Sequence, residues 1–191
     1  MVALINFRRI RNSPLALTVP YLFTNVVAET YGISHDDDYW IYNLATFIEF
    51  GFLFYLFYSY LHDKRIKNLI KSFSLIFFPF DLINMFFIQG MDEFHTLGFI
   101  PATTFTIFLC ICYFRQIILS QVIENPLRDP IFWIATGVLF FYVVAFFPLG
   151  LFHHIENEGA GINKVFNILL KLLNVILYGM YIVALTVRPK P

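Results

Sequence analysis

Three ionisable side chains, Glu49, Asp81 and Lys171, fall inside long apolar stretches of this sequence. A charged group costs on the order of 3 kcal/mol at the centre of a lipid bilayer, so such groups are usually paired or functional. A lysine that lies between two carboxylates can be held in its charged form by them. The three residues could therefore form an internal ion pair that fixes helix register, a ligand pocket or a proton-linked site.

Amide side chains extend this group along two of the predicted helices. Asn84 follows Asp81 by three residues, and Asn167 and Asn174 flank Lys171 at helical spacing, so each set shares one helix face. Counting from the ends of the apolar stretches puts the three charges at a similar depth in the outer half of the membrane. An alternative for Lys171 is that its ammonium reaches toward the interface. The predicted polar layer consists of Glu49, Asp81, Asn84, Asn167, Lys171 and Asn174.

Histidines form a second candidate group, because four of the five lie in polar segments rich in aspartate and glutamate. These are His35, His95, His153 and His154. Imidazole and carboxylate are ordinary zinc or copper ligands, and histidine changes charge near neutral pH. No pair has the i, i+4 spacing of a helical metal site, which favours solvated acidic loops over a metal or pH-sensing site.

Other reaction chemistry has no support in the sequence. It lacks a glycine-rich phosphate loop, a GxSxG elbow, an HExxH pair and a basic patch with interleaved aromatics. Cys110 and Cys112 lie two residues apart within an apolar run and are expected to be packing residues. We therefore predict no catalytic residues, no metal, no cofactor and no nucleic-acid partner.

The elements that carry these residues are predicted from composition. The chain has 191 residues, of which 59% are hydrophobic and 14% charged, whereas ordinary globular domains have about 25% charged residues. Lipid must cover such a surface, and a helix needs roughly 20 apolar residues to cross a bilayer. The sequence predicts an all-α integral membrane bundle over 1–191, a single domain with about six spans near 13–29, 40–61, 72–90, 96–118, 131–152 and 163–187.

Orientation follows from the distribution of charge between the spans. Eleven lysines and arginines lie in alternate segments, namely the amino end, 62–72, 115–130 and the carboxyl tail, while the other segments hold only Lys164 and most of the acids. Basic loops stay on the cytoplasmic side. We therefore expect both termini in the cytoplasm and a bacterial inner membrane as the location. An alternative treats the amino end as a cleavable signal peptide, which would leave five spans.

Several stretches of the chain carry a family resemblance. They are 18–22, 40–43, 47–50, 81–90, 94–96, 125–127, 132–137 and 167–169, with Tyr178 and Tyr181. Together they resemble an uncharacterised family of small multipass membrane proteins of the Bacteroidota. The resemblance implies a membrane sensor module associated with histidine-kinase signalling genes, and a glutamate at the position of Glu49. Lys171 and the stretch from Gly98 to Ala102 depart from the family pattern.

The function predicted from these observations is a non-enzymatic sensory or accessory signalling role. The polar segments on the basic side are too short to form a cytoplasmic domain, so the output would need a separate signalling protein as partner, in addition to the lipid bilayer. A small transporter or channel is the alternative, and it would need a continuous polar path through both leaflets. An intramembrane enzyme is the third hypothesis.

Overall fold

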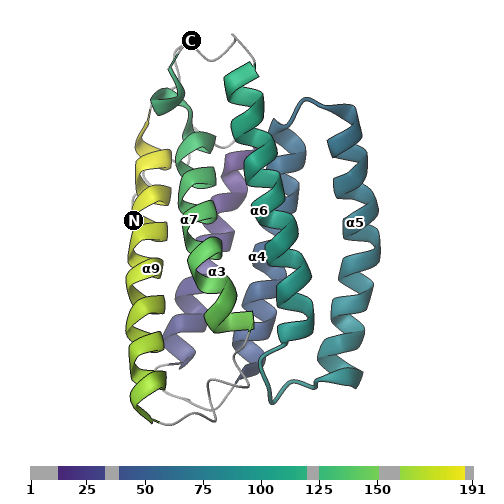
Figure 1. The fold of residues 1–191 in the computed structure, drawn as a ribbon, viewed down its shortest axis with the longest axis vertical. Coiled ribbons are helices and arrows are strands. Elements are labelled where there is room, and N and C mark those ends of the chain that lie inside the picture. The colour runs from purple at the N-terminus through teal and green to yellow at the C-terminus, as the bar shows by residue number, and fades with distance from the viewer. Residues whose placement is uncertain (1–12, 33–38, 120–124, 151–159, 188–191) are drawn as a thin grey trace. The chain divides into compact units, whose positions relative to one another are not determined.

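The computed structural model describes residues 13–32, 39–119, 125–150 and 160–187, and every regular element within these ranges is a helix (Figure 1). The prediction of an all-helical fold is confirmed. Within the described ranges, five helices are long and apolar enough to cross a membrane: Tyr39–Tyr60, Lys64–Ile88, Thr96–Leu119, Pro130–Leu149 and Ile168–Thr186. Each overlaps one of the last five predicted spans.

In chain order the elements are η1 (Pro14–Leu17), α3 (Thr18–Gly32), α4 (Tyr39–Tyr60), α5 (Lys64–Ile83), η2 (Asn84–Ile88), α6 (Thr96–Leu119), η3 (Pro126–Arg128), α7 (Pro130–Gly150) and α9 (Ala160–Thr186).

The first predicted span is helical but shorter than the others. Ser13 caps the 3₁₀ turn η1 by accepting a hydrogen bond from the Leu15 amide at 3.1 Å. The turn then leads into α3, which has 15 residues. Pro20 lies in the first turn of α3, where a missing N–H is tolerated. With this length α3 is not among the five described helices that are long and apolar enough to cross a membrane.

The helix α5 begins at Lys64, ahead of the predicted span at residue 72. Its start is set by Asp63, whose Oδ1 accepts a hydrogen bond of 2.7 Å from the Arg65 amide. Aspartate is a preferred N-cap because it satisfies an amide that has no partner within the helix. The basic residues of segment 62–72 therefore lie mostly on the first turns of a helix and not in a loop.

The other end of α5 is irregular. Pro79 lies inside the helix, and α5 continues directly into the π-helical turn η2. Gly90 then adopts a φ of +82°, a conformation that glycine adopts at little cost. This end of α5 therefore differs in backbone geometry from a regular helix.

Contacts between residues divide the chain into two compact units, with the boundary inside α6: unit 1 is Ala3–Ala102 and unit 2 is Thr103–Pro191. Unit 1 contains α3, α4, α5 and the start of α6, and unit 2 contains the rest of α6 with α7 and α9. The single domain expected from the sequence stays a prediction.

Phenylalanine rings form much of the core of unit 1. Phe50 and Phe54 of α4 are buried and meet Phe73 and Phe77 of α5 edge-to-face. The centroids of Phe54 and Phe73 are 5.6 Å apart with an interplanar angle of 78°. Such a pair contributes about 0.5–1.5 kcal/mol beyond its buried area. Other phenylalanines, such as Phe87 at 83% exposure, are available to lipid.

Unit 2 is organised by the close packing of α7 and α9, which run side by side (Figure 1). A Cβ atom at Gly137 would lie 2.8 Å from the Met180 Cβ, so the glycine allows the two helices to approach. Asp129 caps α7 by accepting from the Ile131 amide at 2.9 Å, and it also accepts from the Tyr113 hydroxyl at 2.5 Å. Cys110 and Cys112 are both buried, as expected for packing residues.

Replacing Asp63 tests whether its side chain determines where α5 begins. Asp63→Ala should lower the free energy of unfolding by about 1 kcal/mol, because the amide of Arg65 loses its acceptor. Asp63→Asn retains a side-chain oxygen and should stay close to the wild type. Thermal unfolding followed by circular dichroism in detergent micelles measures the difference. Equal destabilisation by both substitutions would contradict the capping role.

Candidate functional site

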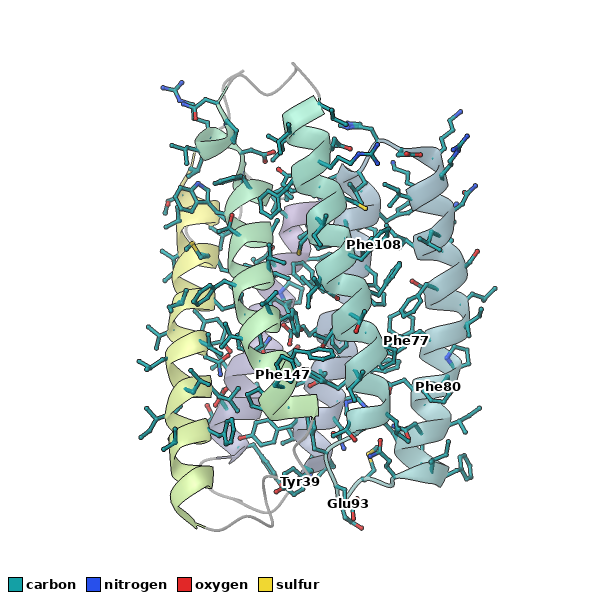
Figure 2. All side chains as sticks on the ribbon, in the orientation of Figure 1. Tyr39, Phe77, Phe80, Glu93, Phe108 and Phe147 are labelled. Atoms are coloured by element: carbon teal, nitrogen blue, oxygen red, sulfur yellow. The ribbon has the colours of Figure 1, made fainter. Side chains whose placement is uncertain are left out.

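The end of α5 and the turn before α6 enclose a buried carboxylate and a buried imidazole. The Oδ1 atom of Asp81 lies 3.0 Å from Nδ1 of His95, and both side chains are 0% exposed. In Figure 2 the labelled residue Glu93 belongs to this turn. The turn lies close to the first part of α4, where Tyr39 is labelled. The sequence had placed Asp81 in the membrane layer and His95 in the acidic loops, so their contact was not predicted.

Asn43 on α4 holds the turn in place through its amide. Its Nδ2 donates to the Glu93 carbonyl at 2.8 Å, and its Oδ1 accepts from the His95 backbone amide at 3.2 Å. Asn43 is itself fully buried. One side chain therefore satisfies two backbone groups of the turn and fixes the position of His95. Asn43 was missing from the predicted site, although a lone asparagine within an apolar stretch could have suggested it.

A second chain of hydrogen bonds stabilises the irregular end of α5. Asn84 donates to Oε1 of Gln89 at 2.9 Å, and Nε2 of Gln89 donates to the Thr96 hydroxyl at 3.1 Å. The same Oε1 atom accepts from the Leu97 backbone amide at 3.0 Å. The π-turn η2 therefore connects through side chains to the first turn of α6. Turns of this kind are frequent at functional sites.

Gly98 makes the close approach of α6 to Asp81 possible. A Cβ atom at this position would lie 1.8 Å from Oδ1 of Asp81 and 3.3 Å from Nδ1 of His95. No side chain fits there while the pair is in place. The structure places Gly98 directly against the Asp81 carboxylate.

Three polar atoms at this site have no hydrogen-bond partner within the described part of the chain. They are Oδ2 of Asp81, Nε2 of His95 and Oδ1 of Asn84. A buried polar atom without a partner costs about 1–3 kcal/mol. The polar network is therefore only partly satisfied, and its unpartnered atoms belong to residues of α5, η2 and the turn before α6.

The carboxylate–imidazole contact determines which hydrogen bonds the site can make. When the carboxylate of Asp81 is ionised it can only accept, and Nδ1–H of His95 is then the donor. In the neutral ring Nε2 is then an acceptor, and in the imidazolium it is a second donor. The protonation state of the ring therefore reverses the hydrogen-bonding role of a buried atom. Among the described residues, no group of three or more His, Cys, Asp or Glu side chains could hold a metal ion.

Glu49 takes part in a different contact of unit 1. It is half-buried, and its Oε1 accepts a hydrogen bond of 2.9 Å from the Tyr21 hydroxyl on α3. The Tyr21 ring stacks on Phe52 with centroids 4.6 Å apart. Glu49 therefore links α3 to α4, whereas Asp81 links α5 to the start of α6.

The remaining predicted residues are in unit 2 or outside the described ranges. On α9, Lys171 is exposed and Asn174 is half-buried. Their pairing with the carboxylates of unit 1 stays a prediction. Asn167 lies on α9, but its side chain is outside the described part of the structure. His35, His153 and His154 also lie outside the described residues.

Comparisons with known proteins found no family model, no curated protein and no solved structure that matches this chain.

Replacing Gly98 tests the contact with Asp81. Gly98→Ala should destabilise unit 1 by about 1–3 kcal/mol, the usual cost of overpacking, because its Cβ would collide with the Asp81 carboxylate. The matched control is Gly51→Ala on α4, whose Cβ would meet only the Phe78 ring at an ordinary 3.7 Å. Alanine favours a helix over glycine, so the control should be neutral or stabilising. Thermal unfolding in micelles compares the two, and equal stability would refute the close contact.

Proposed function

We propose that this chain is a non-enzymatic membrane protein with a sensory or accessory signalling role, and that the Asp81–His95 pair is the element that changes state. The observation that carries this proposal is the 3.0 Å contact between two side chains that are both 0% exposed. A buried carboxylate–imidazole pair can adopt two hydrogen-bond patterns, one with a neutral ring and one with an imidazolium. Two such states are what a small switch requires.

Energetics favour a discrete change at this pair over a gradual one. Removing one partner of a buried hydrogen-bonded pair leaves the other polar group unsatisfied, which costs about 1–3 kcal/mol. The pair is therefore either formed or substantially rearranged. A stimulus that binds or protonates one arrangement better shifts the population toward it.

The surrounding contacts supply a route from the pair to the helices. Asn43 joins α4 to the turn that carries His95, and Gln89 joins η2 to α6. A rearrangement of His95 would alter the hydrogen bonds of both connections. We infer that movement at this end of unit 1 changes how α4, α5 and the start of α6 present their surfaces to a partner.

Burial of the pair also supports a role without catalysis. Asp81 and His95 are the best-placed acid–base groups of unit 1, but neither side chain is exposed. A substrate could not contact them without displacing the turn. The resemblance to Bacteroidota membrane proteins supports the same role, with a separate signalling protein as the partner.

We further propose that the chain crosses a bacterial inner membrane with its basic ends in the cytoplasm and with α3 as a sixth crossing. The charges at the two ends of α5 support this orientation. Lys64 and Arg65 are exposed at its start, and Asp92 and Glu93 are exposed in the turn that follows η2. The turn with the Asp81–His95 pair would then lie near the outer face.

Cysteine labelling tests this orientation. Cys110 and Cys112 are buried, so they should react little with a membrane-impermeant maleimide. Asp92→Cys should be labelled in intact cells, because it would face outward. Lys64→Cys should be labelled only after lysis, because it would face the cytoplasm. The reverse pattern, or labelling of both in intact cells, would overturn the orientation.

Affinity purification tests the signalling role. The full chain is purified in mild detergent from the cells that encode it, and co-purifying proteins and small molecules are quantified by mass spectrometry. Asp81→Asn keeps the shape of the side chain but removes its charge, and it should change recovery of a partner at least several-fold. Glu49→Gln is the matched control, because it makes the same change at the Tyr21 contact.

Each result of this purification bears on the proposal. Recovery of the wild-type protein alone, with no bound protein or small molecule, would count against a sensory role. A response to Glu49→Gln and none to Asp81→Asn would remove the buried pair as the switching element.

A further inference from the structure

A surface groove between α4 and α5 lies apart from the buried pair. Its volume is about 450 Å³, and all its lining residues belong to unit 1. This volume falls within the roughly 300–1,000 Å³ range of small-molecule sites. Most of the lining is apolar, with Phe54 and Phe78 contributing rings from the two helices.

The groove exists because α4 has a glycine where it faces α5. A Cβ atom at Gly51 would have only two neighbours within 4 Å, the Phe78 Cζ and Cε1 atoms at 3.7 and 3.9 Å. A larger side chain at this position would occupy the groove. Gly51 therefore leaves open space beside the Phe78 ring, and this apolar trough offers room for a flexible hydrocarbon chain.

One end of the groove is basic. Lys71 and Tyr58 line it, and Lys67 lies one helical turn before Lys71 on α5. The Nζ atoms of both lysines lie 5.2 Å from the centroid of the Tyr58 ring. Within the described residues neither ammonium has a carboxylate partner. Two cations are therefore held together above one aromatic ring at the mouth of an apolar trough.

We propose that this groove binds one anionic phospholipid, with an acyl chain along the Gly51 trough and the phosphate at Lys67 and Lys71. The hydroxyl of Ser74, which also lines the groove, adds a hydrogen-bond donor for a phosphate oxygen. Charge complementarity favours this occupant over a zwitterionic lipid, because neither ammonium group forms an ion pair with a carboxylate among the described residues. Basic pockets between membrane helices on the cytoplasmic side bind anionic headgroups in this manner.

Native mass spectrometry of the full chain in neutral detergent tests the proposal. The protein is mixed with equal amounts of phosphatidylglycerol and phosphatidylcholine that carry identical acyl chains. We expect clear preference for phosphatidylglycerol. The substitutions Lys67→Gln and Lys71→Gln together should reduce this preference about twenty-five-fold, because each lysine near an anionic headgroup contributes roughly a factor of five.

The matched control is the double variant Lys64→Gln with Arg65→Gln, which removes the same charge from exposed positions on the same helix outside the groove. It should retain the preference. Gly51→Leu should weaken binding of both lipids, because the side chain occupies the trough, while Gly51→Ala should bind nearly as the wild type does. Inorganic phosphate should not compete at concentrations where the lipid saturates.

Three results would overturn the proposal. They are equal binding of the two lipids by the wild type, an equal loss of preference in the two double variants, and full competition by inorganic phosphate. The lysine variants change side chains on the surface and should fold normally, and thermal unfolding checks that they do. The test of headgroup preference is therefore valid even if Gly51→Leu does not fold.

Discussion

The contact between Asp81 and His95 joins the end of α5 to the beginning of α6, and the local structure of unit 1 follows from it. A carboxylate in an apolar setting needs a donor, and the imidazole of the next turn supplies one. To reach it, the chain leaves α5 through a π-turn and reverses at Gly90, and α6 begins with Gly98 against the carboxylate. Each of these irregular features serves the same short contact.

The two ends of α5 illustrate how an apolar protein distributes its polar groups. At the start of the helix, lysines and Arg65 remain exposed, where water or lipid headgroups satisfy them at little cost. At the other end, Asp81, Asn84 and His95 are withdrawn from any solvent. The exposed end is suited to binding an anionic surface, and the buried end is suited to a change of internal hydrogen bonds. The aromatic core between them keeps α4 and α5 together.

Sequence patterns predicted the helices well, because long apolar runs are a strong and local signal. The predicted span begins at residue 72, whereas α5 begins at Lys64, because hydropathy does not register a helical turn of lysines behind an aspartate cap. The sequence marked Asp81 as an acid inside an apolar stretch, and the structure shows that it is buried against His95, a contact that the sequence did not predict. His95 appears in the sequence beside Asp92 and Glu93, which suggests a solvated loop. Only the turn through η2 and Gly90 brings it back against α5, and nothing in residue spacing encodes a π-turn.

The unpartnered atoms bear on whether the buried pair acts as a switch or as a simple structural lock. A lock that only fixed helix register would gain most from complete satisfaction of its polar groups, because every buried atom without a partner costs stability. Asn43 meets that standard, since it satisfies two backbone groups of the turn. Asp81 and His95 do not, because each keeps one atom without a partner among the described residues. Among the described residues, the network is thus fully hydrogen-bonded at its support, Asn43, and incompletely hydrogen-bonded at the Asp81–His95 pair, and that is where a second arrangement would cost least.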